Sequence, residues 1–319
     1  MSSPGDRAAR PTRQGRIEPS AALERLDLRG DRIAFGLAGI GGAWGPVDPV
    51  VARETLRRAL ELGISVFDVA PSYGNAEKLL GEALAGCRGP RPVLSTKVGR
   101  LPTGKTHELK FDFSPAGMKE SVRRSLGTLG VAHVDLLFLH EPDFVPVQER
   151  PRVIGTLRQF QADGQARCLG LGGGFGAGWD GLVESGAFAV AMLFRRLDAC
   201  IFDGLSEDIP RLRRAAMGTY GASPLHMGLL GSRHEEFVRE RPPWVGEAPI
   251  DHAIRLRRVA DQNGLSLAAL AHRFAFSVAE IDRVVIGARN PTELTDAWEA
   301  SQAGPLPAEL FEAVCAAES

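Results

Sequence analysis

Four polar residues of types that move protons stand at or just after the ends of apolar segments in this 319-residue chain. Asp68, Lys97 and His140 each end such a segment, and Tyr73, which is one of only two tyrosines, follows Asp68 by five positions. An ammonium held by a carboxylate and placed beside a phenol favours the phenolate, so we expect the pKa of Tyr73 to fall from about 10 toward neutrality. Such a phenol can protonate a carbonyl oxygen or deprotonate an alcohol. A histidine alongside can orient that oxygen by hydrogen bonding.

Each of these residues has a simpler interpretation when it is taken alone. An aspartate after a strand often caps a helix, and a lysine at a strand end is often a solvated charge. A histidine after an apolar run is commonly a satisfied core residue, and a tyrosine before Gly-Asn commonly packs in a turn. The occurrence of all four on three successive strands is what favours a functional site.

The elements that must position these residues repeat regularly along the chain. We expect eight strands, at 33–37, 64–68, 93–97, 134–140, 166–171, 188–194, 217–222 and 283–287. Helical patterns lie between them, at 49–62, 75–85, 114–129, 151–163, 179–185, 206–215, 250–277 (broken at Gly264) and 291–301, and a further helix is expected at 307–317. Eight strand–helix repeats in about 290 residues are typical of a (β/α)8 TIM barrel, here with an appended C-terminal helix.

A doubly wound open sheet is the alternative fold. It usually carries a glycine-rich turn that opens a helix after the first strand, whereas the glycines at 36–42 are not followed by a helical pattern. We expect residues 1–30 to form a flexible N-terminal arm and lead-in, and residues 31–319 to form one barrel domain. The longest irregular segment, 224–249, would lie on the carboxyl face of the barrel, where active sites are built.

Composition restricts the classes of partner. The formal net charge is −1 and 44% of residues are apolar, which does not favour binding to nucleic acid or to an anionic membrane. No apolar run approaches the ~18 residues needed to span a bilayer, and the polar N-terminus does not resemble a secretory signal. The four cysteines form no CxxC pair, so we expect a reduced, cytoplasmic protein without a structural metal. The oligomeric state is not indicated.

Three motifs together resemble the aldo-keto reductase superfamily, whose members are (β/α)8 barrels. They are D-V-A-P-S-Y-G-N-A-E from residue 68, S-T-K from residue 95 and D-L-L-F-L-H from residue 135. The segments F-D-F-S and A-S-P-L-H-M-G-L-L, from residues 111 and 222, resemble the branch that contains L-galactose dehydrogenase and D-threo-aldose 1-dehydrogenase. The resemblance covers nearly the whole chain after residue 30, and it places the catalytic tetrad of the family on Asp68, Tyr73, Lys97 and His140.

The resemblance implies hydride transfer between a nicotinamide cofactor, NAD or NADP, and a sugar or another small carbonyl or hydroxy compound. Tyr73 would be the general acid in reduction and the general base in oxidation. Trp44 could wall the substrate pocket, or could simply pack on its own loop. The residues expected to contact the cofactor are Gly172, Gly173, Ser223, Leu225, Gly228, Leu229, Gly287, Arg289, Asn290 and Glu293.

The chain departs from the family pattern at the cofactor site. Where the family usually has Ser-Asn after the fifth strand, this chain has L-G-G-G-F from residue 171, whose glycines can still offer backbone N–H groups. The family's Gln after the sixth strand is absent, and Arg195 and Arg196 stand nearby. One arginine could bind an anion at the barrel mouth, or both could pair with Asp198 or Asp203.

Two further interpretations depend on these departures. Glu293 stands where NADP-preferring members carry a cation, which favours NAD, although Arg289 lies close by and could serve the phosphate of NADP. The altered nicotinamide site also leaves an alternative open, a barrel that keeps the acid–base group but acts as a non-redox enzyme or as a binding or regulatory protein.

Overall fold

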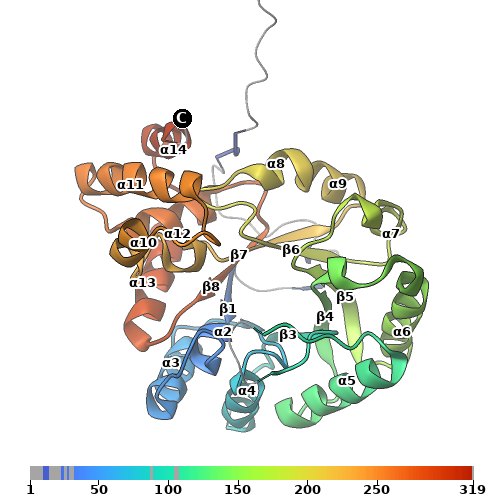
Figure 1. Ribbon diagram of the computed structural model, residues 1–319. Helices are drawn as coiled ribbons and strands as arrows, with labels where there is room; N and C mark the ends of the chain where they lie inside the picture. The colour runs from blue at the N-terminus through green and yellow to red at the C-terminus, as the bar shows by residue number, and fades with distance from the viewer. Residues whose placement is uncertain are drawn as a thin grey trace, which may run out of the picture.

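Eight parallel strands form a closed barrel in sequence order (Figure 1). The computed structural model describes residues 10–13, 23–24, 27–28, 32–86, 89–103 and 108–317. The strands are β1 (Ile33–Gly36), β2 (Val66–Asp68), β3 (Val93–Val98), β4 (Val134–His140), β5 (Ala166–Gly172), β6 (Val190–Phe194), β7 (Gly218–Ala222) and β8 (Arg283–Gly287). The (β/α)8 barrel is confirmed, and the eight expected strands are all present.

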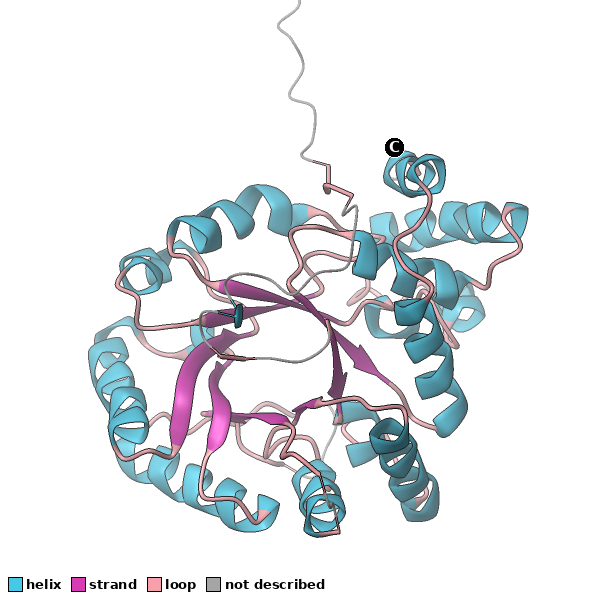
Figure 2. Ribbon diagram, turned by 180° about the vertical axis from the view of Figure 1, so that it is seen from behind, coloured by secondary structure: helices cyan, strands magenta, loops and turns pink. Residues whose placement is uncertain are grey.

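Helices surround the barrel, as the views from both ends show (Figures 1 and 2). They are α2 (Ala38–Gly41), α3 (Pro49–Glu61), α4 (Ala76–Ala85), α5 (Pro115–Leu129), α6 (Arg150–Ala162), α7 (Asp180–Glu184), α8 (Asp203–Glu207), α9 (Ile209–Arg214), α10 (His234–Glu240), α11 (Glu247–Gln262), α12 (Leu267–Ser277), α13 (Pro291–Gln302) and the appended α14 (Ala308–Ala316). Short 3-10 turns lie at Pro142–Phe144, Val147–Glu149, Ala177–Trp179 and His226–Gly228. Helix starts follow local chemistry, since the side chain of Asp48 caps α3 and that of Ser114 caps α5.

Two sequence expectations about loops are wrong. The glycine-rich segment after β1 does contain a helix, the single turn α2, which ends where Gly42 adopts a left-handed φ of 89°. The segment 224–249 is not irregular throughout, because α10 forms within it and buries Phe237. Both helices are too short to produce a readable apolar periodicity.

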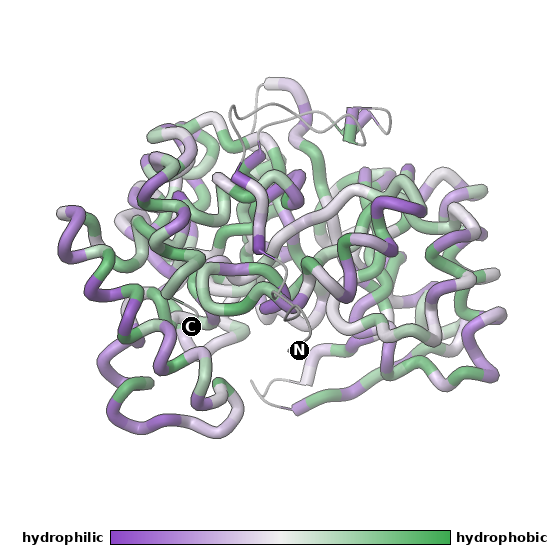
Figure 3. Tube along the Cα trace, turned by 90° about the horizontal axis from the view of Figure 1, so that it is seen from above, coloured by the Kyte–Doolittle hydropathy of each residue, from purple (hydrophilic) through white to green (hydrophobic). Residues whose placement is uncertain are grey.

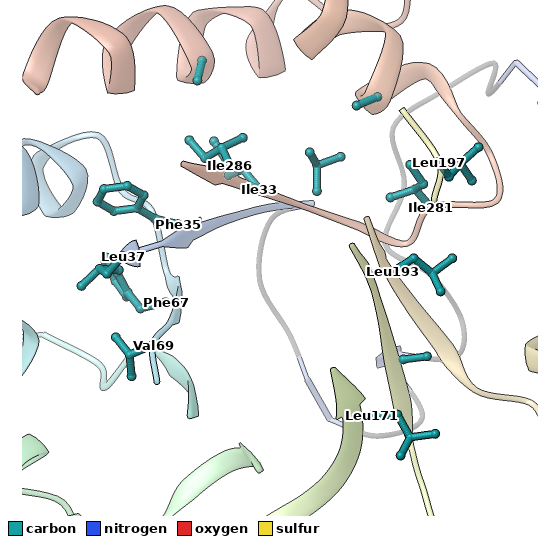
Figure 4. Packing of buried hydrophobic residues seen from close by; sticks show 14 of the residues in the cluster. Ile33, Phe35, Leu37, Phe67, Val69, Leu171, Leu193, Leu197, Ile281 and Ile286 are labelled. Atoms are coloured by element: carbon teal, nitrogen blue, oxygen red, sulfur yellow. The ribbon is translucent and has the colours of Figure 1, made fainter. Parts of the chain in front are cut away.

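The strands bury side chains on both faces, as expected for a parallel sheet covered by helices. Outward residues pack against the helix ring, and Figure 4 shows Phe35, Phe67, Leu171, Leu193 and Ile286 in this layer. The alternate, inward residues fill the barrel lumen; they include Val66, Leu136, Phe138, Met192 and Tyr220. Along the outer helices, hydrophilic and hydrophobic stretches alternate (Figure 3), which is the pattern of amphipathic helices.

Most of the expected arm over residues 1–30 lies outside the described residues. The residues of this segment that are described contact the barrel: Leu23 and Leu28 join the lumen cluster, and the backbone carbonyl of Leu28 accepts a hydrogen bond from buried Arg283. Thr12 accepts one from the backbone of Ala279. None of the helices in the described part of the chain is long and apolar enough to cross a membrane.

Candidate active site

The barrel brings three of the predicted residues to neighbouring strand ends. Asp68 ends β2 and His140 ends β4, while Lys97 is the penultimate residue of β3 between them. Strands β2 and β3 pair with each other, as do β3 and β4, and Lys97 lies opposite Phe138 in that register. Because Phe138 points into the lumen, Lys97 and His140 lie on the same inward face, at the carboxyl end of the barrel.

Asp68 and Lys97 form a buried ion pair. The Lys97 ammonium donates to Oδ2 of Asp68 and, at 3.0 Å, to the carbonyl of Val69. The other oxygen of Asp68 accepts from Ser95 Oγ at 2.7 Å. Burial by itself lowers the pKa of Lys97, but attraction to Asp68 and to Tyr73 reverses this, so the pKa is raised and the side chain stays charged.

Tyr73 lies in the loop after β2, against both other groups. The Lys97 ammonium is 4.7 Å from the centroid of the Tyr73 ring. The Tyr73 and His140 rings meet edge to face with centroids 5.9 Å apart. The structure therefore brings the four predicted side chains together on one rim.

The expected lowering of the Tyr73 pKa is wrong for this structure. Burial of the phenol raises its pKa, and the charge of Lys97 opposes that effect without overcoming it. The sequence argument considered the ammonium but not the loss of water around the hydroxyl. Tyr73 is therefore in its protonated, donor form at neutral pH.

Two glycines position the Tyr73 loop. A Cβ on Gly41 would stand 2.1 Å from the backbone oxygen of Tyr73, and one on Gly74 would stand 2.2 Å from the oxygen of Gly41. Gly74 also has a left-handed φ of 60°. The carbonyl of Gly41 accepts a hydrogen bond from the N–H of Asn75 at 2.9 Å. The loop therefore rests directly on the backbone of α2, which only glycine permits.

His140 is buried and neutral. Its pKa lies well below the usual value because of burial, with further lowering by the charges of Lys97 and Arg100. Its Nδ1 has no hydrogen-bond partner among the described residues. A neutral imidazole beside a protonated phenol can hydrogen bond a substrate oxygen while the phenol donates a proton to it.

The glycine run after β5 does not offer the free backbone donors that we expected. The N–H of Gly173 donates to the carbonyl of Met192 at 3.3 Å, and that of Gly174 donates to the carboxylate of Glu141. A Cβ on Gly173 would stand 2.4 Å from Oε2 of Glu141. The Glu141 side chain therefore occupies the space beside the glycines, and burial raises its pKa.

The predicted pyrophosphate loop follows β7. Ser223 has a left-handed φ of 68°, and its hydroxyl accepts a hydrogen bond from the N–H of Met227 at 3.0 Å. The N–H of Gly228 donates to the carbonyl of Leu225 at 2.9 Å, and Leu229 is fully buried beneath the loop. This loop is a tight, internally bonded turn.

The expected adenosine end of the cofactor site lies at the end of the neighbouring strand, β8. A Cβ on Gly287, at the end of β8, would meet no atom within 4 Å, which leaves open space over the rim. Asn290 caps α13 by accepting from the N–H of Glu293, and Glu293 in turn accepts from the N–H of Arg289. The guanidinium of Arg289 donates to the carbonyl of Pro46. The arrangement leaves a carboxylate at the start of α13.

The two arginines after β6 are both engaged. Arg196 pairs with Asp203, Glu207 and Asp208. Arg195 donates to the carbonyl of Trp244 at 3.3 Å and contacts Nε2 of His226 at 3.2 Å. Arg195 therefore stabilises the loop after β7 through these contacts. Neither sequence interpretation, an anion site or pairing with an aspartate, included them.

Trp44 lies in the loop after α2 and is 41% exposed. Its role in a substrate pocket stays a prediction.

Two residues of the site, Glu141 and Arg100, were not predicted from the sequence. The signal for both was proximity in sequence, since Glu141 follows His140 directly and Arg100 follows Lys97 by three positions.

Comparison with known proteins gives one consistent result. The model of the aldo/keto reductase family matches residues 32–318. L-Galactose dehydrogenase of Arabidopsis thaliana is 29% identical over 290 residues, covering 86% of this chain and 85% of that protein. D-Threo-aldose 1-dehydrogenase of Pseudomonas sp is 27% identical over 318 residues, covering 92% and 95%. A solved structure of a glycerol dehydrogenase from Gluconobacter oxydans superposes with a TM-score of 0.72 at 25% identity, covering 90% of this chain and 91% of that one.

Proposed function

Because this chain belongs to the aldo/keto reductase family and is an NAD(P)-dependent oxidoreductase, we propose that Tyr73 is its proton donor and acceptor. The substrate is a sugar or another small carbonyl or hydroxy compound. The observation that carries the proposal is the buried Asp68–Lys97 pair set against the Tyr73 ring, with His140 at the edge of that ring.

The mechanism follows from the protonation states. A nicotinamide cofactor bound at this rim would supply or accept the hydride at the substrate carbon. In reduction, Tyr73 gives its proton to the carbonyl oxygen, and Lys97 stabilises the phenolate that forms. Asp68 holds Lys97 in place, and neutral His140 hydrogen bonds the same oxygen. In oxidation, the phenolate takes the proton from the alcohol.

The cofactor contacts are part of the proposal. Ser223, Leu225, Gly228 and Leu229 would hold the pyrophosphate, and Gly287, Arg289 and Asn290 would lie at the adenosine end. Gly172 and Gly173 would lie near the nicotinamide. We propose NAD as the preferred cofactor, because the Glu293 carboxylate at the start of α13 would repel a 2′-phosphate.

A Tyr73→Phe variant tests the acid–base role. We expect kcat to fall by about 10²- to 10⁴-fold, the usual contribution of a general acid or base, while the dissociation constant for the nicotinamide cofactor stays within about twofold. Full activity in Tyr73→Phe would refute the assignment.

A second candidate function is favoured by one observation, the consumption of the Gly173 and Gly174 N–H groups within the protein. Without donors for the nicotinamide amide, the acid–base group could serve a non-redox reaction, or the barrel could serve as a binding or regulatory protein. Titration of the intrinsic tryptophan fluorescence separates the two. Saturable binding of NADH or NADPH supports the oxidoreductase, and no binding at millimolar concentration supports the alternative.

A further inference from the structure

Arg100 stands at the carboxyl end of β3 on a rigid piece of backbone. The N–H of Leu101 donates to the carbonyl of Lys110, and the N–H of Asp112 donates to that of Gly99, both at 2.8 Å. These bonds flank the bridge between Arg100 and Phe111. Gly99 has a left-handed φ of 108° with the Phe113 ring against its Cα. The direction in which the Arg100 side chain leaves the backbone is therefore fixed.

The guanidinium of Arg100 is unpaired in the described part of the chain. It forms no ion pair or hydrogen bond there, and its Nε is buried without a partner. Arg195 and Arg289, on other loops of the same face, instead donate to backbone carbonyls. A buried donor without a partner costs free energy, so the unpaired guanidinium of Arg100 has donors that a ligand can satisfy.

The charge of Arg100 reaches the reacting groups. Burial raises the pKa of Tyr73 and Glu141 and lowers that of His140, and the charge of Arg100 favours a lower pKa in all three cases, so the guanidinium lies within electrostatic range of all three. The charge of Lys97 is balanced by its ion pair with Asp68. Arg100 therefore places a second positive charge within range of the site, and in the described part of the chain no carboxylate forms an ion pair with it.

The position of Arg100 also separates it from the proposed cofactor phosphates. Those groups are assigned to loops after β7 and β8, and β3 lies four strands from β7 in a closed ring of eight. The end of β3, which Arg100 follows, is thus across the barrel from β7, where the proposed pyrophosphate loop begins; Figure 1 shows the positions of these two strands. The anion that it faces belongs to the substrate side.

We infer that Arg100 binds an anionic group, a carboxylate or a phosphate, carried by the substrate of the proposed oxidoreductase. The planar fork of the guanidinium can grip either group through two N–H donors. The aromatic pair of Phe111 and Phe144, stacked at 4.5 Å, lies beside Arg100 through the bridge to Phe111 and offers an apolar surface to the carbon skeleton. The substrate class is therefore a small carbonyl or hydroxy compound with an acidic group.

Matched aldehydes test this inference. Succinic semialdehyde is compared with butanal, and glyceraldehyde 3-phosphate with glyceraldehyde. The first pair measures the effect of a carboxylate on kcat/KM, and the second measures the effect of a phosphate. In Arg100→Met, kcat/KM for the anionic member of at least one pair should fall roughly 10- to 100-fold, the loss expected for a charge-assisted contact. The neutral members should change by less than about threefold.

Two further variants sharpen the result. Arg123→Met removes an exposed arginine that pairs with Glu120 on α5 and should leave both pairs unchanged. Arg100→Lys keeps the charge without the fork and should restore part of the lost kcat/KM. An equal fall for anionic and neutral aldehydes in Arg100→Met, or a wild-type enzyme that prefers neither anionic member, would overturn the inference.

The inference rests on the proposed function, and direct binding separates their failures. Succinate and inorganic phosphate are titrated by calorimetry against the wild type and Arg100→Met. If no nicotinamide binds or turns over, the proposed function fails, and Arg100 is judged by this titration alone. If either anion binds the wild type and does not bind Arg100→Met, the proposed anion site is supported. If neither anion binds the wild type, the proposed site is refuted.

Discussion

A Gly41→Ala substitution provides a test of how the fold sets the chemistry. Gly41 ends the one-turn helix α2, and the Tyr73 loop rests on it. An added methyl would stand 2.1 Å from the backbone oxygen of Tyr73 and 2.8 Å from the Cβ of Ala76. Contacts under 3.0 Å essentially never occur for a real Cβ. One of the two backbone segments must therefore move.

The size of the effect follows from this geometry. Restoring an acceptable contact requires the Tyr73 carbonyl to retreat by about 1 Å, and overpacking of this kind costs about 1–3 kcal/mol of stability. A misplacement of about 1 Å at a reacting group lowers rates by roughly 10²-fold. We expect kcat to fall by about that factor, while the cofactor dissociation constant stays nearly constant, because the added methyl faces Tyr73 and Ala76 and not the loops after β7 and β8.

The assay combines steady-state kinetics, nicotinamide titration and thermal unfolding. Gly127→Ala is the control, because a Cβ at that position in α5 would meet no atom within 4 Å and should leave kcat unchanged. A Gly41→Ala enzyme with wild-type kcat would refute the reasoning. A fall in kcat accompanied by an equal loss of cofactor binding would also refute it, since the damage would then extend beyond the Tyr73 loop.

Three other predictions concern charge. Glu293→Gln keeps the cap on α13 but removes a negative charge. The dissociation constant for NADPH relative to that for NADH should therefore fall by about fivefold, the equivalent of about 1 kcal/mol. An unchanged ratio in a fluorescence titration would argue against the proposal that Glu293 disfavours NADP. Burial lowers the pKa of His272 to about 4, so the unfolded state binds the His272 proton before the folded state does as the pH falls from 6.5 to 4, and the protein should lose about 3 kcal/mol of stability over that window. When urea unfolding at pH 7 is compared with that at pH 4.5, His272→Leu should lose correspondingly less stability than the wild type. An equal loss in both proteins would contradict this origin. The pKa of Tyr73 is raised, so the rate of alcohol oxidation should keep rising with pH through 9, whereas the rate of carbonyl reduction should stay level. An oxidation rate that stops rising near pH 7 would show that the phenol ionises at a lower pH than its raised pKa implies.

The sequence was sufficient to predict the fold because the repeat is regular. Strand positions followed from short apolar runs between glycines and helix caps, and the structure places all eight within two residues of the expected bounds. The helices α2 and α10 were missed, since four and seven residues are too few for periodicity to show. The segment 224–249 was read as irregular for the same reason.

The positions of Asp68, Lys97 and His140 were predictable because strand ends converge in a barrel. The pKa values of the site residues were harder to predict from the sequence. The direction of the Tyr73 pKa depends on how deeply the phenol is enclosed, which a linear pattern does not report. Likewise, the N–H of Gly173 donates to Met192 on the neighbouring strand β6, and the side chain of Glu141, which follows β4, occupies the space beside Gly173. Such contacts depend on three-dimensional neighbours.

The same strand register specifies both the core and the rim that carries the proposed acid–base group. On β4, Leu136 and Phe138 point into the lumen, and the next inward position is His140. A slip of one residue would turn His140 toward the helix layer and bring Leu139 to the mouth. The apolar pattern that stabilises the barrel therefore also fixes the acid–base group. Residues on loops, such as Arg100 and Glu141, are not fixed by this alternation, whereas the groups on the strands are.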